Sequence, residues 1–326
     1  MDILNPENLR GKARTALRRG REPKKLIYTY AGISLAVSAA VYLINLWLNH
    51  QISGTGGLGN IGTRAIFSTI QTILPLAASA VAMCMDLGFL GGMLRIVRGQ
   101  YADHTDLKTG FRKFWPLVRL TLIRTAMYFA AMFLSVQLGS LIFSFTPWAG
   151  PLLEVLTPIA MSGEMMMEEA ELLELLPKML PLLITVGIVT LVMLLPMLFK
   201  LRMCCFCLLD DPKGRALAAI GESNRMMRGR FVQMLKVDLS NWLYYGATVL
   251  VTLVLYSDVI LLLLGVPLPL DVNVYSMIIY GLSAALQCAV HIWLRPTAEL
   301  TYLAAYDQLR EKPEDSGVVL GNIFEM

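Results

Sequence analysis

The stretch Leu198–Tyr245, LFKLRMCCFCLLDDPKGRALAAIGESNRMMRGRFVQMLKVDLSNWLYY, decides the fold class of this chain. An apolar helix leads into it, a basic segment turns the chain, and an apolar segment flanked by Trp242 and Tyr244 leads out. Basic loops between apolar helices, with aromatic residues at the helix ends, are typical of the cytoplasmic side of a membrane protein. The stretch therefore predicts two membrane spans joined by a cytoplasmic loop.

The composition extends this prediction to the whole chain. Of its 326 residues, 56% are hydrophobic and 16% are charged, whereas a soluble domain carries about a quarter charged residues. Apolar runs of about 20 residues, long enough to cross a bilayer, recur along the sequence. We predict an all-α polytopic membrane helix bundle of six transmembrane helices with short amphipathic cytoplasmic helices. The predicted spans are residues 26–48, 65–94, 117–145, 179–201, 241–264 and 274–294.

The segments that flank the membrane domain, residues 26–311, have their own character. Residues 1–25 are basic, and Asn5 before Pro6 predicts a helix start, with Asn as the capping residue and Pro in the first turn. This segment is either an amphipathic helix on anionic lipid or a signal that orients the first span, and both interpretations can hold. Residues 312–326 are predicted to be a disordered tail.

The distribution of basic residues predicts the orientation. On this map 26 of the 28 Lys and Arg residues fall on one side of the membrane, and only Arg64 and Lys178 fall on the other. Because basic residues are retained in the cytoplasm, we expect a cell-membrane protein with both termini cytoplasmic.

Three charged residues within the predicted spans are candidates for a site. Asp86 and Arg124 lie at matching depths, roughly 12–14 Å from the inner ends of their spans at 1.5 Å per residue, and are predicted to form an intramembrane ion pair. The pair is either structural or part of an ion or substrate gate, because charges inside a bilayer are costly and usually paired. Asp258 has no obvious charged partner and is a candidate for lining a polar cavity.

No motif in the sequence points to catalysis. It contains no phosphate-binding loop, nucleophile elbow or zinc-protease motif. We therefore predict a protein that is not an enzyme, with no catalytic residue, cofactor or metal. The Met-rich acidic stretch near Glu164–Glu174 has two interpretations, the apolar face of a surface helix and a soft-metal site.

The basic cytoplasmic side predicts the partners. We expect contacts with anionic lipid head groups, no nucleic acid, and a membrane-protein partner or a homo-oligomer. The candidate head-group contacts are Arg10, Arg14, Arg18, Arg19, Arg225 and Arg228. These features favour a non-enzymatic membrane scaffold or partner protein. The alternative is a small transporter or permease subunit with a polar path near Asp86, Arg124 and Asp258.

Short motifs spread over nearly the whole chain resemble a known family. They are Pro196-x-x-x-Lys200, Asp211-Pro212, Glu222-Ser223-x-x-x-Met227-x-Gly229, the Gly-rich end of the second span, Gly110-Phe111-x-x-Phe114 and Tyr302-x-x-x-Tyr306-x-x-Leu309. Together with the basic helix before the first span, they resemble the uncharacterised bacterial multi-pass family called domain of unknown function 975. The resemblance implies an integral membrane protein without an established reaction and carries over no catalytic residue. The chain departs from the family in its acidic Met-rich outer segment, which is longer.

The topology can be tested with reporter fusions. A reporter fused after Asp211 should be cytoplasmic and one fused after Glu171 extracytoplasmic, because the basic residues divide so unevenly between the two sides. Reporters that give the same side at both positions would show that the span map is wrong.

Overall fold

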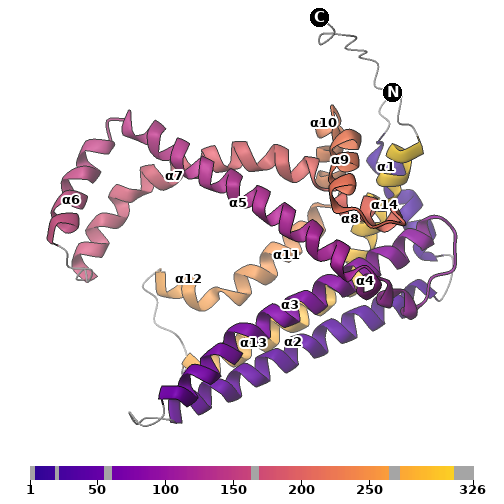
Figure 1. The fold of residues 1–326 in the computed structure, drawn as a ribbon, viewed down its shortest axis with the longest axis horizontal. Helices are drawn as coiled ribbons and strands as arrows, with labels where there is room; N and C mark the ends of the chain where they lie inside the picture. The colour runs from indigo at the N-terminus through magenta and orange to yellow at the C-terminus, as the bar shows by residue number, and fades with distance from the viewer. Residues whose placement is uncertain (1–3, 19–21, 55–60, 163–168, 264–271, 312–326) are drawn as a thin grey trace, which may run out of the picture. The chain divides into compact units, whose positions relative to one another are not determined.

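A computed structural model describes residues 4–18, 22–54, 61–162, 169–263 and 272–311. Within these ranges every regular element is a helix (Figure 1), which confirms the predicted all-α class. The predicted disordered tail 312–326, Arg19 and the Met-rich residues 163–168 lie outside the described residues. The contacts divide the chain into two compact units. Unit 1 comprises residues 1–117, 205–215 and 229–326, and unit 2 comprises residues 118–204 and 216–228.

Five helices among the described residues are long and apolar enough to cross a membrane. They are α2 (Glu22–Gly54), α3 (Ile61–Val97), α5 (Phe114–Ser144), α7 (Glu169–Lys200) and α13 (Val272–Trp293). Each overlaps one of the predicted spans. Large apolar side chains are exposed along them, such as Phe129, which is 72% exposed, and Val192, which is 65% exposed. Such a surface is consistent with a membrane protein, because soluble monomers seldom expose large apolar patches.

The predicted span 241–264 is not one helix. It forms α11 (Trp242–Leu255) and α12 (Ser257–Leu263), with a break at Tyr256. Asp258 accepts a hydrogen bond from the backbone N–H of Val259 at 2.8 Å, and the Ser257 and Tyr275 hydroxyls lie 3.1 Å apart. Ser and Asp side chains compete with helical backbone hydrogen bonds in this way. At 1.5 Å per residue, α11 is about 21 Å long, shorter than the apolar core of roughly 30 Å.

In unit 1, α2, α3 and α13 lie side by side (Figure 1), and the exposure of α3 changes along its length. Residues 61–83 are exposed or half-buried wherever their burial is described, whereas most residues from Cys84 to Ile96 are buried. The first turns of α2 are likewise covered, with Leu26 and Tyr30 buried. The apolar runs therefore combine two environments. One part of α3 presents apolar side chains outward, and the other is the core of a protein layer, here called the platform.

The platform surrounds α14 (Arg295–Glu311). Along this helix, Leu300, Leu303, Ala305 and Leu309 are at most 1% exposed. Besides α14 it contains the ends of α2 and α3 and the short helices α1 (Pro6–Arg18), η2 (His104–Leu107), α4 (Lys108–Arg112), α8 (Cys204–Asp210) and α10 (Phe231–Ser240).

The N-terminal helix α1 starts as predicted. The side chain of Asn5 accepts a hydrogen bond from the backbone N–H of Glu7 at 3.0 Å, which confirms its capping role. Leu9, Ala13 and Ala16 on its apolar face are buried, and the helix packs on α14. The apolar face of α1 is thus covered by protein, while Arg14 and Arg18 are exposed.

Glycines allow η2 and α4 to fold tightly back against α3. A Cβ atom at Gly110 would lie 1.7 Å from the carbonyl oxygen of Cys84, and one at Gly88 would lie 2.3 Å from that of Leu107. At Gly92 a Cβ atom would meet the side chain of Leu26 at 2.6 Å. The Gly88-x-x-x-Gly92 spacing thus serves a close approach, as such motifs do.

Unit 2 contains α5, α6 (Ala149–Ser162), α7 and α9 (Ala216–Met227). A Cβ atom at Gly139 of α5 would lie 2.8 Å from the Cα of Val186, so α5 and α7 cross closely there. The hydroxyl of Ser223 donates to the carbonyl of Lys200 at 2.7 Å and accepts from the N–H of Met203 at 3.1 Å. Ser223 therefore fixes α9 to the end of α7.

The glycine contacts give a stability prediction. Gly110→Ala should destabilise the protein by at least about 1–3 kcal/mol, the usual cost of overpacking, because its Cβ would collide with backbone. Gly32→Ala in α2 is the matched control, since nothing lies within 4 Å of a Cβ atom there. Thermal unfolding in detergent measures both, and equal midpoints for the two variants would contradict the tight packing of α4 on α3.

Candidate functional site

The buried guanidinium of Arg295 is the centre of a polar cluster within unit 1. Its side chain is 10% exposed. Nη2 donates to Oδ1 of Asp86 in α3 at 3.0 Å, and Nη1 donates to the hydroxyl of Tyr30 in α2. The Tyr30 hydroxyl donates in turn to the same carboxylate oxygen of Asp86. One turn further along α14, Glu299 accepts from Nε of Arg295 at 3.4 Å. The cluster joins α2, α3 and α14.

Aromatic rings enclose the guanidinium. Its central carbon lies 4.9 Å from the ring centroid of Tyr30 and 5.3 Å from that of Phe89, within cation–π range. Nδ1 of His291 lies 3.4 Å from Nη1 of Arg295, and Nε2 of His291 lies 3.0 Å from the side-chain nitrogen of Gln287. The end of α13 therefore also belongs to the cluster.

The chemistry of this cluster is that of a neutralised buried cation. Burial opposes the charge of Arg295, but the carboxylates of Asp86 and Glu299 raise its pKa above the ordinary value. A buried ion pair with satisfied hydrogen bonds holds helices in one arrangement, and removing one partner is expensive. The side chain of Asp86 is 43% exposed, so one side of the cluster is accessible.

The sequence did not identify Arg295 as the partner of Asp86. Arg295 directly follows the last predicted span, and His291 and Glu299 stand four residues before and after it. That spacing places all three on one helical face and was the available signal. Arg124 belongs to unit 2, where its guanidinium carbon lies 5.8 Å from the ring centroid of Tyr128. The predicted Asp86–Arg124 pair joins separate units and stays a prediction.

A second charged cluster lies at the other end of α14. Arg98 binds Asp210 through two hydrogen bonds of 2.8 and 2.7 Å, and its Nη2 donates to Asp307 at 2.8 Å. Arg310 and the hydroxyl of Tyr306 also donate to Asp210, at 2.7 and 2.9 Å. The hydrogen bonds that Arg98 donates to Asp210 raise the pKa of Arg98. Two carboxylates and two guanidinium groups balance one another here.

Lys113 fixes the end of α8 next to this cluster. Its Nζ donates to the carbonyl oxygens of Leu208, Leu209 and Asp211 at 2.9, 2.8 and 3.0 Å. Cations stabilise the carbonyl end of a helix. Burial lowers the pKa of Lys113, and the neighbouring aspartates oppose that shift.

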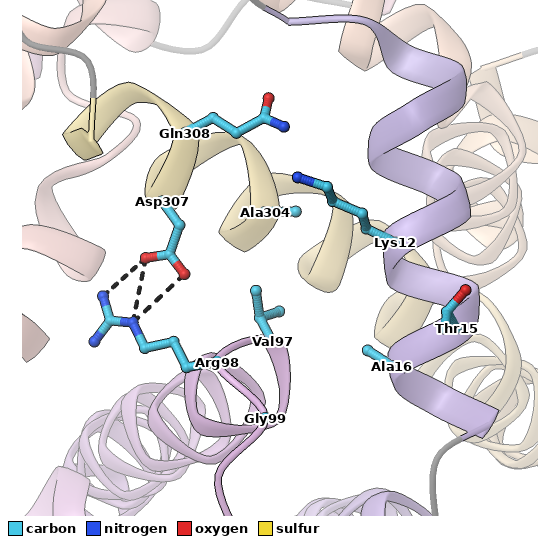
Figure 2. Close-up of a pocket in the computed structure, with 9 residues that line it drawn as sticks. All are labelled: Lys12, Thr15, Ala16, Val97, Arg98, Gly99, Ala304, Asp307 and Gln308. Carbon is cyan, nitrogen blue, oxygen red and sulfur yellow. Dashed lines mark hydrogen bonds and ion pairs between the residues drawn. The ribbon is translucent and has the colours of Figure 1, made fainter.

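Three cavities accompany these clusters in unit 1. One of about 590 Å³ lies between α1, the end of α3 and α14, with Lys12, Arg98 and Asp307 in its wall (Figure 2). Another of about 260 Å³ lies along α2 and α3, with Tyr30, Ser34, Ser38 and Ser79 among the residues that line it. The third, about 160 Å³, is lined by Asp258 together with Tyr42 and Tyr275.

The candidate lipid contacts lie on the surface where the structure describes them. Arg14, Arg18 and Arg228 are exposed, and Arg10 is half-buried. Arg225 is exposed but bound to Glu222 at 2.6 Å. Among the described residues, no group of three or more His, Cys, Asp or Glu side chains is arranged to hold a metal ion.

Comparison with known proteins adds no relative. No protein-family model, curated protein or solved structure matches the chain. The resemblance to domain of unknown function 975 therefore stays a prediction that rests on the motifs quoted above.

A double-mutant cycle tests the buried cluster. Arg295→Gln should cost about 3–5 kcal/mol of stability, the usual result of breaking a buried pair, because two carboxylates lose their shared guanidinium. Asp86→Asn should cost less, because Arg295 keeps Glu299. The double variant Asp86→Asn with Arg295→Gln should lose less unfolding free energy than the sum of the losses in the two single variants, because the two residues interact directly.

The matched control is Asp86→Asn combined with Arg124→Gln. If Arg295 neutralises Asp86, these two changes should add in the midpoint of thermal unfolding. Coupling between Asp86 and Arg124, together with additivity between Asp86 and Arg295, would reverse the assignment.

Proposed function

We propose that this chain is a non-enzymatic scaffold or partner protein of the cell membrane, with both termini in the cytoplasm. The observation that carries the proposal is the cluster around Arg98, Asp210 and Asp307. It brings together the end of α3, the segment 205–215 and α14, which are far apart in the sequence. Its charged groups bind one another and thereby hold these segments together.

The outer surface of the platform supports a role at anionic lipid. Arg14 and Arg18 are exposed while the apolar face of α1 is packed on α14. A basic residue near an anionic membrane contributes on the order of 1 kcal/mol of binding. The exposed arginines of the platform are thus free to contact head groups while the apolar face of α1 stays packed on α14.

Membership of the family called domain of unknown function 975 is part of this proposal. Several motif residues behind the resemblance hold the fold together. Gly110 allows α4 to touch α3, Ser223 ties α9 to α7, and Tyr306 binds Asp210. Such residues suit a family defined by its fold and not by a reaction.

A small transporter or permease subunit is the second candidate function. It is favoured by the 260 Å³ cavity along α2 and α3, because Tyr30 belongs both to the wall of that cavity and to the Asp86 cluster. Ligand sites in proteins are usually larger, about 300–1,000 Å³, so this cavity fits only a small solute.

Flux through reconstituted protein separates the two functions. If the protein is a scaffold, proteoliposomes that contain it should dissipate imposed proton, sodium and potassium gradients no faster than empty liposomes. Saturable flux that Asp86→Asn abolishes, while the surface variant Arg14→Gln leaves it intact, would establish the transporter instead.

A further inference from the structure

Unit 2 has a cavity that none of the functions above uses. Its volume is about 420 Å³, and it lies between α5, the end of α7 and α9. Three methionines form much of its apolar wall, and two polar side chains lie at its α7 and α9 sides. These residues are Met127, Met193, Met197, Lys200 and Asn224.

The apolar wall belongs to helices that present apolar side chains outward. Met193 and Met197 are half-buried on α7, where neighbouring residues such as Val192 are 65% exposed. Methionine side chains are flexible and adapt to irregular apolar partners. The wall therefore suits a flexible hydrocarbon chain arriving from the bilayer side.

The polar side of the cavity marks the end of the apolar helix. Lys200 is the last residue of α7, and its side chain is exposed. Its carbonyl is bound by the Ser223 hydroxyl at 2.7 Å, which fixes α9, and with it Asn224, against the end of α7. The backbone of Lys200 is thus fixed beside the apolar wall, and its exposed side chain carries a positive charge there.

The charge at this end of unit 2 is strongly positive. Within the described part of the unit, the carboxylate at this end is Glu222, which binds Arg225 at 2.6 Å. The basic residues at the same end, by their places on or directly after α5, α7 and α9, are Arg119, Arg124, Lys200, Arg202, Arg225 and Arg228. An anionic head group meets a field of the opposite sign here.

We propose that this cavity binds one anionic phospholipid, with an acyl chain against Met193 and Met197 and its phosphate at Lys200. The proposal rests on the membrane function proposed above, and it adds a specific site to the general basic surface. A zwitterionic lipid lacks the net charge that this end of the unit attracts.

The test is binding of phosphatidylglycerol to the purified full-length protein in detergent, measured by native mass spectrometry. Lys200→Gln should weaken binding about tenfold, the effect of losing a charge-assisted hydrogen bond. Lys178→Gln is the matched control, because Lys178 is the other lysine of α7 and stands away from the cavity. It should leave binding unchanged. Met193→Ala should also weaken binding, because it removes contacts with the acyl chain and leaves the cavity wider than the chain needs.

Other outcomes would overturn the proposal. Equal losses in Lys200→Gln and Lys178→Gln would show a diffuse basic surface and no site. Equal binding of phosphatidylcholine would show that the site does not require a negatively charged lipid. Equal competition by inorganic phosphate would show that the site binds phosphate and does not recognise a lipid. Because the readout is lipid occupancy and not flux, it can fail while the scaffold function stands.

Discussion

Asp86 meets Arg295 and Arg98 meets Asp307, and both pairs join α3 to α14. Arg98 directly follows α3, twelve positions after Asp86, and Asp307 is twelve positions after Arg295 in α14, which is about 18 Å at 1.5 Å per residue. The helices therefore run parallel and in register. Because the order of signs is opposite in the two helices, an antiparallel arrangement would place Asp against Asp and Arg against Arg. The four charges thus select one direction and one register, in the way buried polar groups can specify a structure.

The remaining parts of the platform attach to this pair of helices. Tyr30 brings the start of α2 to the first ion pair, and Asp210 brings α8 to the second. The apolar face of α1 then covers α14. Burial of Arg295 is tolerated because rings, a phenol and two carboxylates surround it. Each added element also shields the ion pairs from water, which strengthens them.

Local features of the platform could be predicted from the sequence, and its tertiary contacts could not. The cap at Asn5 follows from local chemistry, as do the five long apolar helices. The point along α3 where its side chains become buried does not, because Leu87 and Met93 are as hydrophobic as the outward-facing side chains of α3, although both are buried in protein. Hydropathy measures removal from water and does not distinguish the two environments. Arg295 was missed for a related reason, since a basic residue after a span is ordinarily a topology signal.

The ion pairs that join α3 to α14 also bear on the choice between scaffold and transporter. Transport by alternating access requires helices to move against each other around a site. In unit 1, the two ends of α14 are bound to α3, and α2 is bound through Tyr30, so these three helices move together unless buried ion pairs break. The break at Tyr256 between α11 and α12 is a place where motion needs fewer changes, and the Asp258 cavity lies beside it. Movement of α12 beside Asp258 would leave the ion pairs of the Asp86 cluster intact, whereas transport through the cavity along α2 and α3 requires them to break.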